Sequence, residues 1–191
     1  SKFNSIRGEM NMTTKWKETL YGRLNELDRL YRETHKTEYL MEDDTICHVL
    51  GNTGAIYESI ARFCNEHSIE RVVDIGCAYG HQSEIFYEQG IDYTGVSDGK
   101  HEFWKDHGNY FVQRYPAEIP VKEGDLGVSV FCLGWNVYLY EGDKTLREQC
   151  EALKKDFKPC LIHGNSESLN MLSNYFEKVR HVGDKLYDFS N

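Results

Sequence analysis

Residues 71–81 carry an apolar run that ends in an acid and passes directly into a glycine-containing loop. The run reads Arg-Val-Val-Asp-Ile, and Gly76 and Gly80 follow it four positions apart. Helix-forming residues come next, so the segment predicts a buried strand, a tight loop and the first turn of a helix. Such a junction directs backbone N–H groups and the positive end of a helix dipole at one point, which favours a bound ligand there.

The size and charge of the chain limit what it can bind. Its 191 residues suit one α/β domain with an appendage, and a hydrophobic content of 40% supports a packed core. The formal net charge of −9 opposes non-specific attraction to the phosphates of nucleic acids or to anionic membranes. We therefore expect a small-molecule substrate rather than a nucleic acid, and no membrane partner.

The cysteines and the N-terminus bear on the compartment. The six cysteines form no C-x-x-C pair, and several lie inside apolar runs, where a thiol packs as a small hydrophobic group. Free thiols indicate a reducing compartment. The chain has neither the run of about 18 apolar residues that a membrane-spanning helix needs nor the apolar core of a signal peptide. We expect a cytoplasmic monomer or homodimer, with residues 1–12 as a disordered leader or tag remnant.

The first third of the chain predicts helices. Residues 13–36 place apolar side chains at intervals of three and four, the spacing of an amphipathic helix. A polar, acidic stretch at 37–44 predicts a linker. Two more helical patterns follow at 45–52 and 54–67, with a break between them at 51–54, where two glycines fall.

Short apolar runs alternate with helical stretches from residue 70 onward, a pattern typical of β-α-β units and a parallel sheet. The predicted strands lie at 72–75, 93–96, 110–113, 128–133 and 159–163. Helices are predicted at 82–88 and 146–157, and Gly183-Asp184 is a hairpin signal between two final strands. The chain is thus expected to divide into a helical cap at 13–68 and an α/β core at 69–191.

The loop after the first strand, D-x-G-x-x-x-G, resembles the first motif of the Class I, Rossmann-like S-adenosylmethionine-dependent methyltransferases, (D/E)-x-G-x-G-x-G. Asp74, Gly76 and Gly80 match this motif, and Ala78 stands at its middle glycine. The resemblance implies an α/β fold with a doubly wound, mostly parallel sheet that ends in an antiparallel hairpin. It also implies S-adenosylmethionine as the cofactor and methyl transfer as the reaction.

The resemblance also implies which residues would bind the cofactor. The first-motif loop contributes Asp74, Gly76, Cys77, Ala78, Tyr79 and Gly80. In the family an acid at the end of the second strand binds the ribose hydroxyls, and Ser97 or Asp98 falls at that place. The segment 116–120 looks like the family's D-A-E-x-L-P, so Ala117 and Glu118 are expected beside the adenine.

Five further residues are candidates for the reacting end of the site. Gly134 and Trp135 follow the fourth predicted strand, where relatives approach the methyl group, although Trp135 suits a core position equally well. Tyr57 would close over the cofactor as N-terminal aromatics do in relatives. Methyl transfer is an in-line displacement, so a base is needed only where the acceptor must lose a proton. His81 and His163 are the candidate bases.

Three departures from the family pattern, Ala78, Ser97 and Pro116, leave a second interpretation open. It is a cofactor-binding but non-methylating regulatory or assembly protein. A nicotinamide-dependent oxidoreductase is disfavoured, because the loop does not read G-x-G-x-x-G. The end of the fourth predicted strand lacks the acidic constellation of a catechol-type metal site, so no metal is expected.

Overall fold

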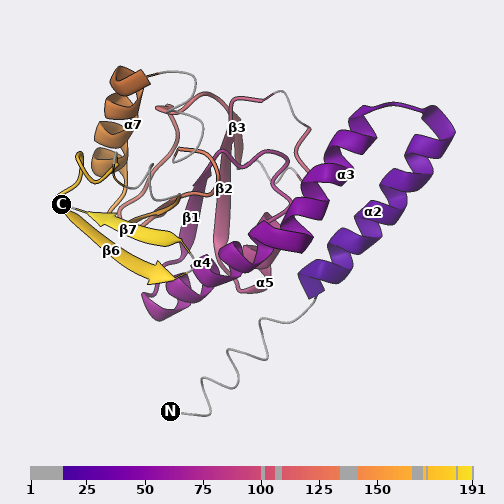
Figure 1. Cartoon of the computed structure of the whole chain (residues 1–191). Helices are drawn as coiled ribbons and strands as arrows, with labels where there is room; N and C mark the ends of the chain where they lie inside the picture. Colours follow the sequence, from indigo (N-terminus) through magenta and orange to yellow (C-terminus); the bar gives the residue numbers. More distant parts are fainter. Residues whose placement is uncertain are drawn as a thin grey trace, which may run out of the picture.

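The computed structural model describes residues 15–99, 102–105, 109–133, 142–164, 170, 172–183 and 185–190. Seven strands form one sheet with the order β3-β2-β1-β4-β5-β7-β6. Helices α2 and α3 form an antiparallel pair that extends to one side of this sheet (Figure 1). The expected segment 1–12 and the expected site residues Gly134 and Trp135 lie outside the described residues.

The N-terminal part is more continuously helical than the sequence predicts. It contains α2 (Lys15–Thr34), α3 (Glu38–His48), a π-helical turn η1 (Val49–Thr53) and α4 (Gly54–Glu66). The predicted linker at 37–44 is therefore wrong. Its acids are compatible with a helix because Glu42, the one that is buried, is paired with Arg23 of α2 at 2.9 Å.

The predicted break at 51–54 is also wrong, because η1 carries the helix from α3 into α4. Gly54 is needed for packing rather than for a turn. A Cβ there would lie 2.5 Å from the indole of Trp16, which is itself buried. The glycine thus lets α2 lie close against the start of α4.

The sheet confirms the fold class. Strands β1 (Arg71–Ile75), β2 (Asp92–Ser97), β3 (Tyr110–Val112), β4 (Leu126–Ser129) and β5 (Cys160–His163) pair in parallel. Strand β7 (Leu186–Ser190) is antiparallel between β5 and β6 (Lys178–Gly183). The final hairpin therefore inserts its last strand into the sheet, as the resemblance implies.

Strand β4 ends earlier than the predicted 128–133. The N–H of Leu133 bonds to the Ser129 hydroxyl at 2.9 Å and closes a turn. Phe131, inside that turn, has a left-handed backbone with φ of +52°. The apolar run continues past the end of pairing, which is why the sequence pattern overstates the strand.

Apolar side chains cover both faces of the sheet, as the alternation along β1 illustrates. Val72 packs with buried residues of α2, α4 and α5 (Ser83–Glu88) on one face. Val73 packs on the other face with Leu153 of α7 (Gly142–Asp156). This two-sided covering is the doubly wound arrangement, and the N-terminal helices share one apolar core with the sheet. The boundary between cap and core near residue 68 stays a prediction.

Strand β6 forms one edge of the sheet (Figure 1). The side chains of Lys178, Val179, Arg180 and His181 on this strand are exposed. None of the helices in the described ranges is long and apolar enough to cross a membrane.

Candidate functional site

A cavity of about 410 Å³ lies where β1 and β4 end, between the first-motif loop and the α3–η1 segment. Ligands of open α/β sheets bind at this edge, beyond the carboxyl ends of the strands. The loop side of the cavity is formed by Gly76, Cys77, Ala78, Tyr79, His81 and Gln82. The remaining wall consists of Thr45, His48, Val49, Asn52, Thr53, Tyr57, Val130 and Phe131.

The backbone of the loop is left-handed at three positions, with φ of +85° at Gly76, +50° at Ala78 and +75° at Gly80. A Cβ on Gly80 would lie 2.6 Å from the Tyr110 hydroxyl, and one on Gly76 would overlap Cys132. Both glycines are therefore fixed by close approach as well as by conformation. Ala78 adopts the same region at a cost of roughly 1–2 kcal/mol, and its small side chain keeps the cavity open.

Asp74, which precedes the loop under the cavity, is fully buried. Its carboxylate accepts hydrogen bonds from Gln82 Nε2 at 2.8 Å, from the Tyr57 hydroxyl at 3.3 Å and from the Tyr93 hydroxyl. Burial raises the pKa of Asp74 to about 6, against the three hydrogen bonds, which favour the charged form. Tyr57 and Gln82 line the cavity, so their hydrogen bonds to Asp74 hold two lining side chains in position.

His81 ties the loop to α3. Its Nε2 lies 3.2 Å from Glu42 Oε1, its Nδ1 lies 3.4 Å from the Thr45 hydroxyl, and only 1% of its side chain is exposed. Burial lowers the pKa of His81, although the neighbouring Glu42 acts in the opposite direction. The ring also stacks on Tyr79 at 5.6 Å between centroids. Both ring nitrogens of His81 therefore have partners within the protein.

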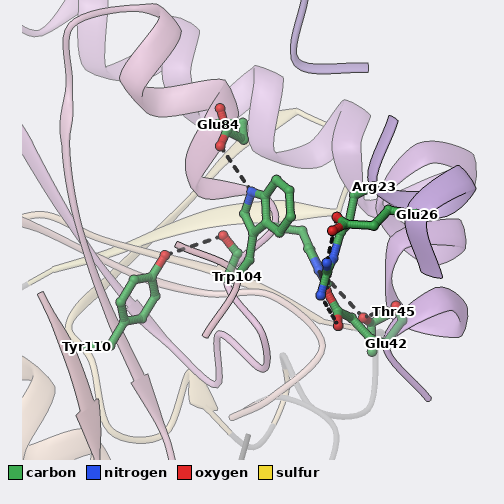
Figure 2. Close-up of polar contacts among 9 residues, drawn as sticks. Arg23, Glu26, Glu42, Thr45, Glu84, Trp104 and Tyr110 are labelled. Carbon is green, nitrogen blue, oxygen red and sulfur yellow. Dashed lines mark hydrogen bonds and ion pairs between the residues drawn. The ribbon is translucent and has the colours of Figure 1, made fainter. Parts of the chain in front are cut away.

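The same contacts reach α2 and the chain after β2 (Figure 2). Arg23 donates two hydrogen bonds of 2.9 Å to Glu42 and lies over the Trp104 ring at 5.2 Å. The Trp104 indole donates to Glu84 of α5 at 3.0 Å. Hydrogen bonds to His81 and Arg23 outweigh burial and lower the pKa of Glu42. The network fixes the α2–α3 pair against the loop that forms the cavity.

No family model and no curated protein matches this chain. Solved structures do match it. The 2.2 Å structure of WbdD aligns with a TM-score of 0.54 at 16% identity, covering 72% of this chain and 39% of that one. A S-adenosylmethionine-dependent methyltransferase from Clostridium acetobutylicum ATCC 824 aligns with a TM-score of 0.51 at 14% identity, over 76% and 65% of the two chains.

WbdD is described as a bifunctional kinase-methyltransferase. This chain has the Class I methyltransferase fold. It spans 39% of the WbdD chain and 65% of the clostridial one, so the likeness covers only part of each.

Within this methyltransferase fold, Ser97 ends β2 and Asp98 follows it, and the two side chains differ in exposure. The Ser97 side chain is buried, and its hydroxyl accepts a bond from the Gly99 N–H at 3.3 Å. Asp98 is exposed, and neither it nor Ser97 is among the described residues that line the cavity. Asp98 is the more accessible of the two expected ribose contacts.

The other predicted site residues fall in different places. Ala117 and Glu118 lie on the chain between β3 and β4 and are not among the described residues that line the cavity. The Glu118 N–H and carbonyl both bond to the Gln113 side chain, at 3.0 and 3.3 Å. His163 is 2% exposed, its ring packs against Phe131 at 4.3 Å, and burial lowers its pKa. Their functional assignments stay predictions.

The sequence predicts that the helical segment at 45–67 covers the acceptor site, but it does not single out the polar side chains that line the cavity, Thr45, His48, Asn52 and Thr53. Thr45, His48 and Asn52 are three and four positions apart, the spacing of one helix face, and Thr53 follows directly. Single π turns occur frequently at functional sites, which supports the importance of this segment. Within the described ranges no group of three or more His, Cys, Asp or Glu side chains could hold a metal ion.

Proposed function

We propose that this chain binds S-adenosylmethionine over the loop from Gly76 to Gly80 and transfers its methyl group to a small-molecule acceptor. One observation carries the proposal: a cavity of about 410 Å³ sits on that loop in a Class I methyltransferase fold. Small-molecule sites commonly measure about 300–1,000 Å³. The cavity is thus of a suitable size for a cofactor end and a small acceptor together.

The described residues suit this cofactor. The small side chain of Ala78 borders the cavity in a left-handed turn, which lets a ligand approach the backbone closely. Asp98 offers an exposed carboxylate at the end of the neighbouring strand, and a carboxylate can accept two ribose hydroxyls at once. Tyr57 contributes an aromatic wall whose hydroxyl is bonded to Asp74.

When bound, the cofactor supplies a methyl group on a positively charged sulfur. The part of the protein is to hold the acceptor in line with that methyl and to exclude water. The Asp74 hydrogen bonds fix Tyr57 and Gln82, and the Glu42–His81 contact fixes the loop against α3. These contacts keep the cavity walls in place before any ligand enters, which reduces the ordering cost of binding.

Asp98→Asn should weaken binding of S-adenosylhomocysteine about tenfold, because one charge-assisted hydrogen bond to the ribose becomes a neutral one. Isothermal titration calorimetry measures the change. Asp92→Asn is the matched control, since Asp92 is exposed at the opposite end of the same strand. Equal affinities for the two variants would remove Asp98 from the site. Absence of any binding to the unmodified chain at millimolar ligand would refute the proposal as a whole.

A non-methylating, cofactor-binding protein is the second candidate, favoured by Ala78, Ser97 and Pro116 at positions where the family has other residues. The two functions differ in turnover. Tight binding of S-adenosylhomocysteine without methylation of any acceptor would favour the second.

A further inference from the structure

A second cavity of about 410 Å³ lies at the opposite end of the sheet from the first-motif loop. It is bordered by Pro159, directly before β5 begins, and by Ser190, where β7 ends. Strand β5 is parallel to β4, so the start of β5 and the end of β4 are at opposite ends of the sheet. The two cavities share none of their described lining residues. The second one therefore offers a separate place for a small molecule, and its volume is in the usual range for such sites.

Three phenylalanine rings line this second cavity. Phe157 follows the end of α7, Phe176 precedes β6, and Phe189 lies on β7. All three side chains are buried in the core cluster that contains α7. The rings of Phe176 and Phe189 pack at 5.1 Å between centroids. Because core packing already holds these rings, they give a ligand an apolar surface at little ordering cost.

Two lysines bring positive charge to the same cavity. The Lys154 ammonium lies 5.6 Å from the centroid of the Phe176 ring, and its side chain is 22% exposed. Its ion-pair partner Glu151, at 3.3 Å, is 62% exposed. A pair this open to water is weak, so another carboxylate could replace Glu151. Lys158, two residues beyond the end of α7, also lines the cavity and is exposed.

The other charged residue of the described lining is Asp188, whose carboxylate lies on the opposite face of the sheet from the Phe189 ring. Side chains alternate between the two faces along a strand. Phe189 packs in the cluster that contains α7, whereas Leu186 packs in the cluster on the other face. Asp188 shares the face of Leu186, and its Oδ2 lies 3.3 Å from Arg180 of β6. The lysines therefore set the charge on the side of the cavity where the phenylalanines lie.

We infer that the second cavity binds a small carboxylate with an aromatic body. The carboxylate pairs with Lys154 and Lys158 and takes the place of Glu151 at Lys154, while the body lies against the phenylalanine rings. The formal net charge of −9 opposes attraction of anions to the chain as a whole. The apolar contact and the charge contact are therefore both needed. This site is separate from the proposed cofactor cavity, and the inference does not depend on that proposal.

The test titrates the full, ¹⁵N-labelled chain with 3-phenylpropanoate and follows the backbone amide signals by NMR. 3-Phenylpropan-1-ol and 3-phenylpropan-1-amine have the same body with a neutral or a positive end, and acetate has the carboxylate without the ring. We expect 3-phenylpropanoate to bind about tenfold more tightly than the alcohol or the amine, and acetate to show no binding at millimolar concentration. The amide signals of Lys154, Lys158 and Ser190 should shift during the titration.

Replacing both lysines, Lys154→Gln with Lys158→Gln, should weaken binding of 3-phenylpropanoate about tenfold, because two ion pairs are lost. Lys155→Gln is the matched control. Lys155 is exposed and lies between the two lysines in the sequence, but it is not among the described residues that line the cavity. Its substitution should leave the affinity unchanged.

Four results would overturn the inference. The first is no binding of 3-phenylpropanoate at millimolar concentration. The second is equal affinity for the carboxylate, the alcohol and the amine, which would mean that the lysines do not select the ligand. The third is a set of shifted signals at Gly76–Gly80, which would place the probe in the cavity at the first-motif loop. The fourth is an equal loss of affinity in the Lys155→Gln control and in the double variant.

Discussion

Replacing Asp74 with asparagine should remove about 3 kcal/mol of pH dependence from the stability of this chain between pH 4 and pH 7. In the folded chain burial raises the pKa of Asp74 from 3.8 to about 6. The folded state therefore holds its proton over a pH range in which the unfolded state has lost it. The contribution is fully present below pH 4 and is lost as the pH rises through 6, since each pKa unit is worth about 1.36 kcal/mol.

Urea unfolding at pH 4, 5, 6 and 7 measures the effect as the difference in unfolding free energy between the variant and the unmodified chain. Whatever the difference is at pH 4, the unfolding free energy of the variant should rise relative to that of the unmodified chain as the pH increases. Asp92→Asn, at an exposed position on β2, should give a curve parallel to that of the unmodified chain. Parallel curves for Asp74→Asn would mean that the Asp74 carboxyl is not desolvated in solution.

Glu42→Ala should destabilise the chain by about 3 kcal/mol, because removing one partner of a buried ion pair leaves the other uncompensated. The side chains of Glu42 and Arg23 are 9% and 19% exposed and share two hydrogen bonds of 2.9 Å. His81 would lose its Glu42 contact at the same time. The loop would then be held less firmly against α3.

Glu33→Ala provides the comparison for this second variant. Its partner Arg29 lies one helical turn earlier, and both side chains are more than half exposed. Such surface pairs contribute about 0.5 kcal/mol, so the loss should be several-fold smaller than for Glu42→Ala in the same urea titration. A double-mutant cycle with Arg23→Ala isolates the coupling energy. A coupling near zero would contradict a buried Arg23–Glu42 pair.

The central sheet could be predicted from the sequence, because its strands are short apolar runs buried on both faces. Val72 and Val73 illustrate this, since each packs into a different core cluster. The sheet order could be anticipated only through the resemblance. Apolar pattern does not specify where pairing stops, and the run that contains β4 continues through a turn at Phe131.

The cap and the candidate site were harder to predict, because their decisive contacts join residues far apart in the sequence. The polar, acidic sequence around Glu42 predicts a solvated linker, yet Arg23 and His81, 19 and 39 positions away, pair with Glu42 and bury it within a helix. The motif predicts that Asp74 contributes to cofactor binding. Its position in the motif does not reveal that Tyr57 and Tyr93 enclose its carboxylate.

The edge formed by β6 has a consequence for how copies of the chain meet. An unpaired strand edge invites another chain to add its own strand, which is a common start of fibril growth. Here Lys178 and Arg180 project from that edge, and Arg180 is paired with Asp188 of β7. An incoming strand would have to dehydrate these cations. The β6 edge should therefore resist the addition of strands from other copies of the chain, as occurs in amyloid.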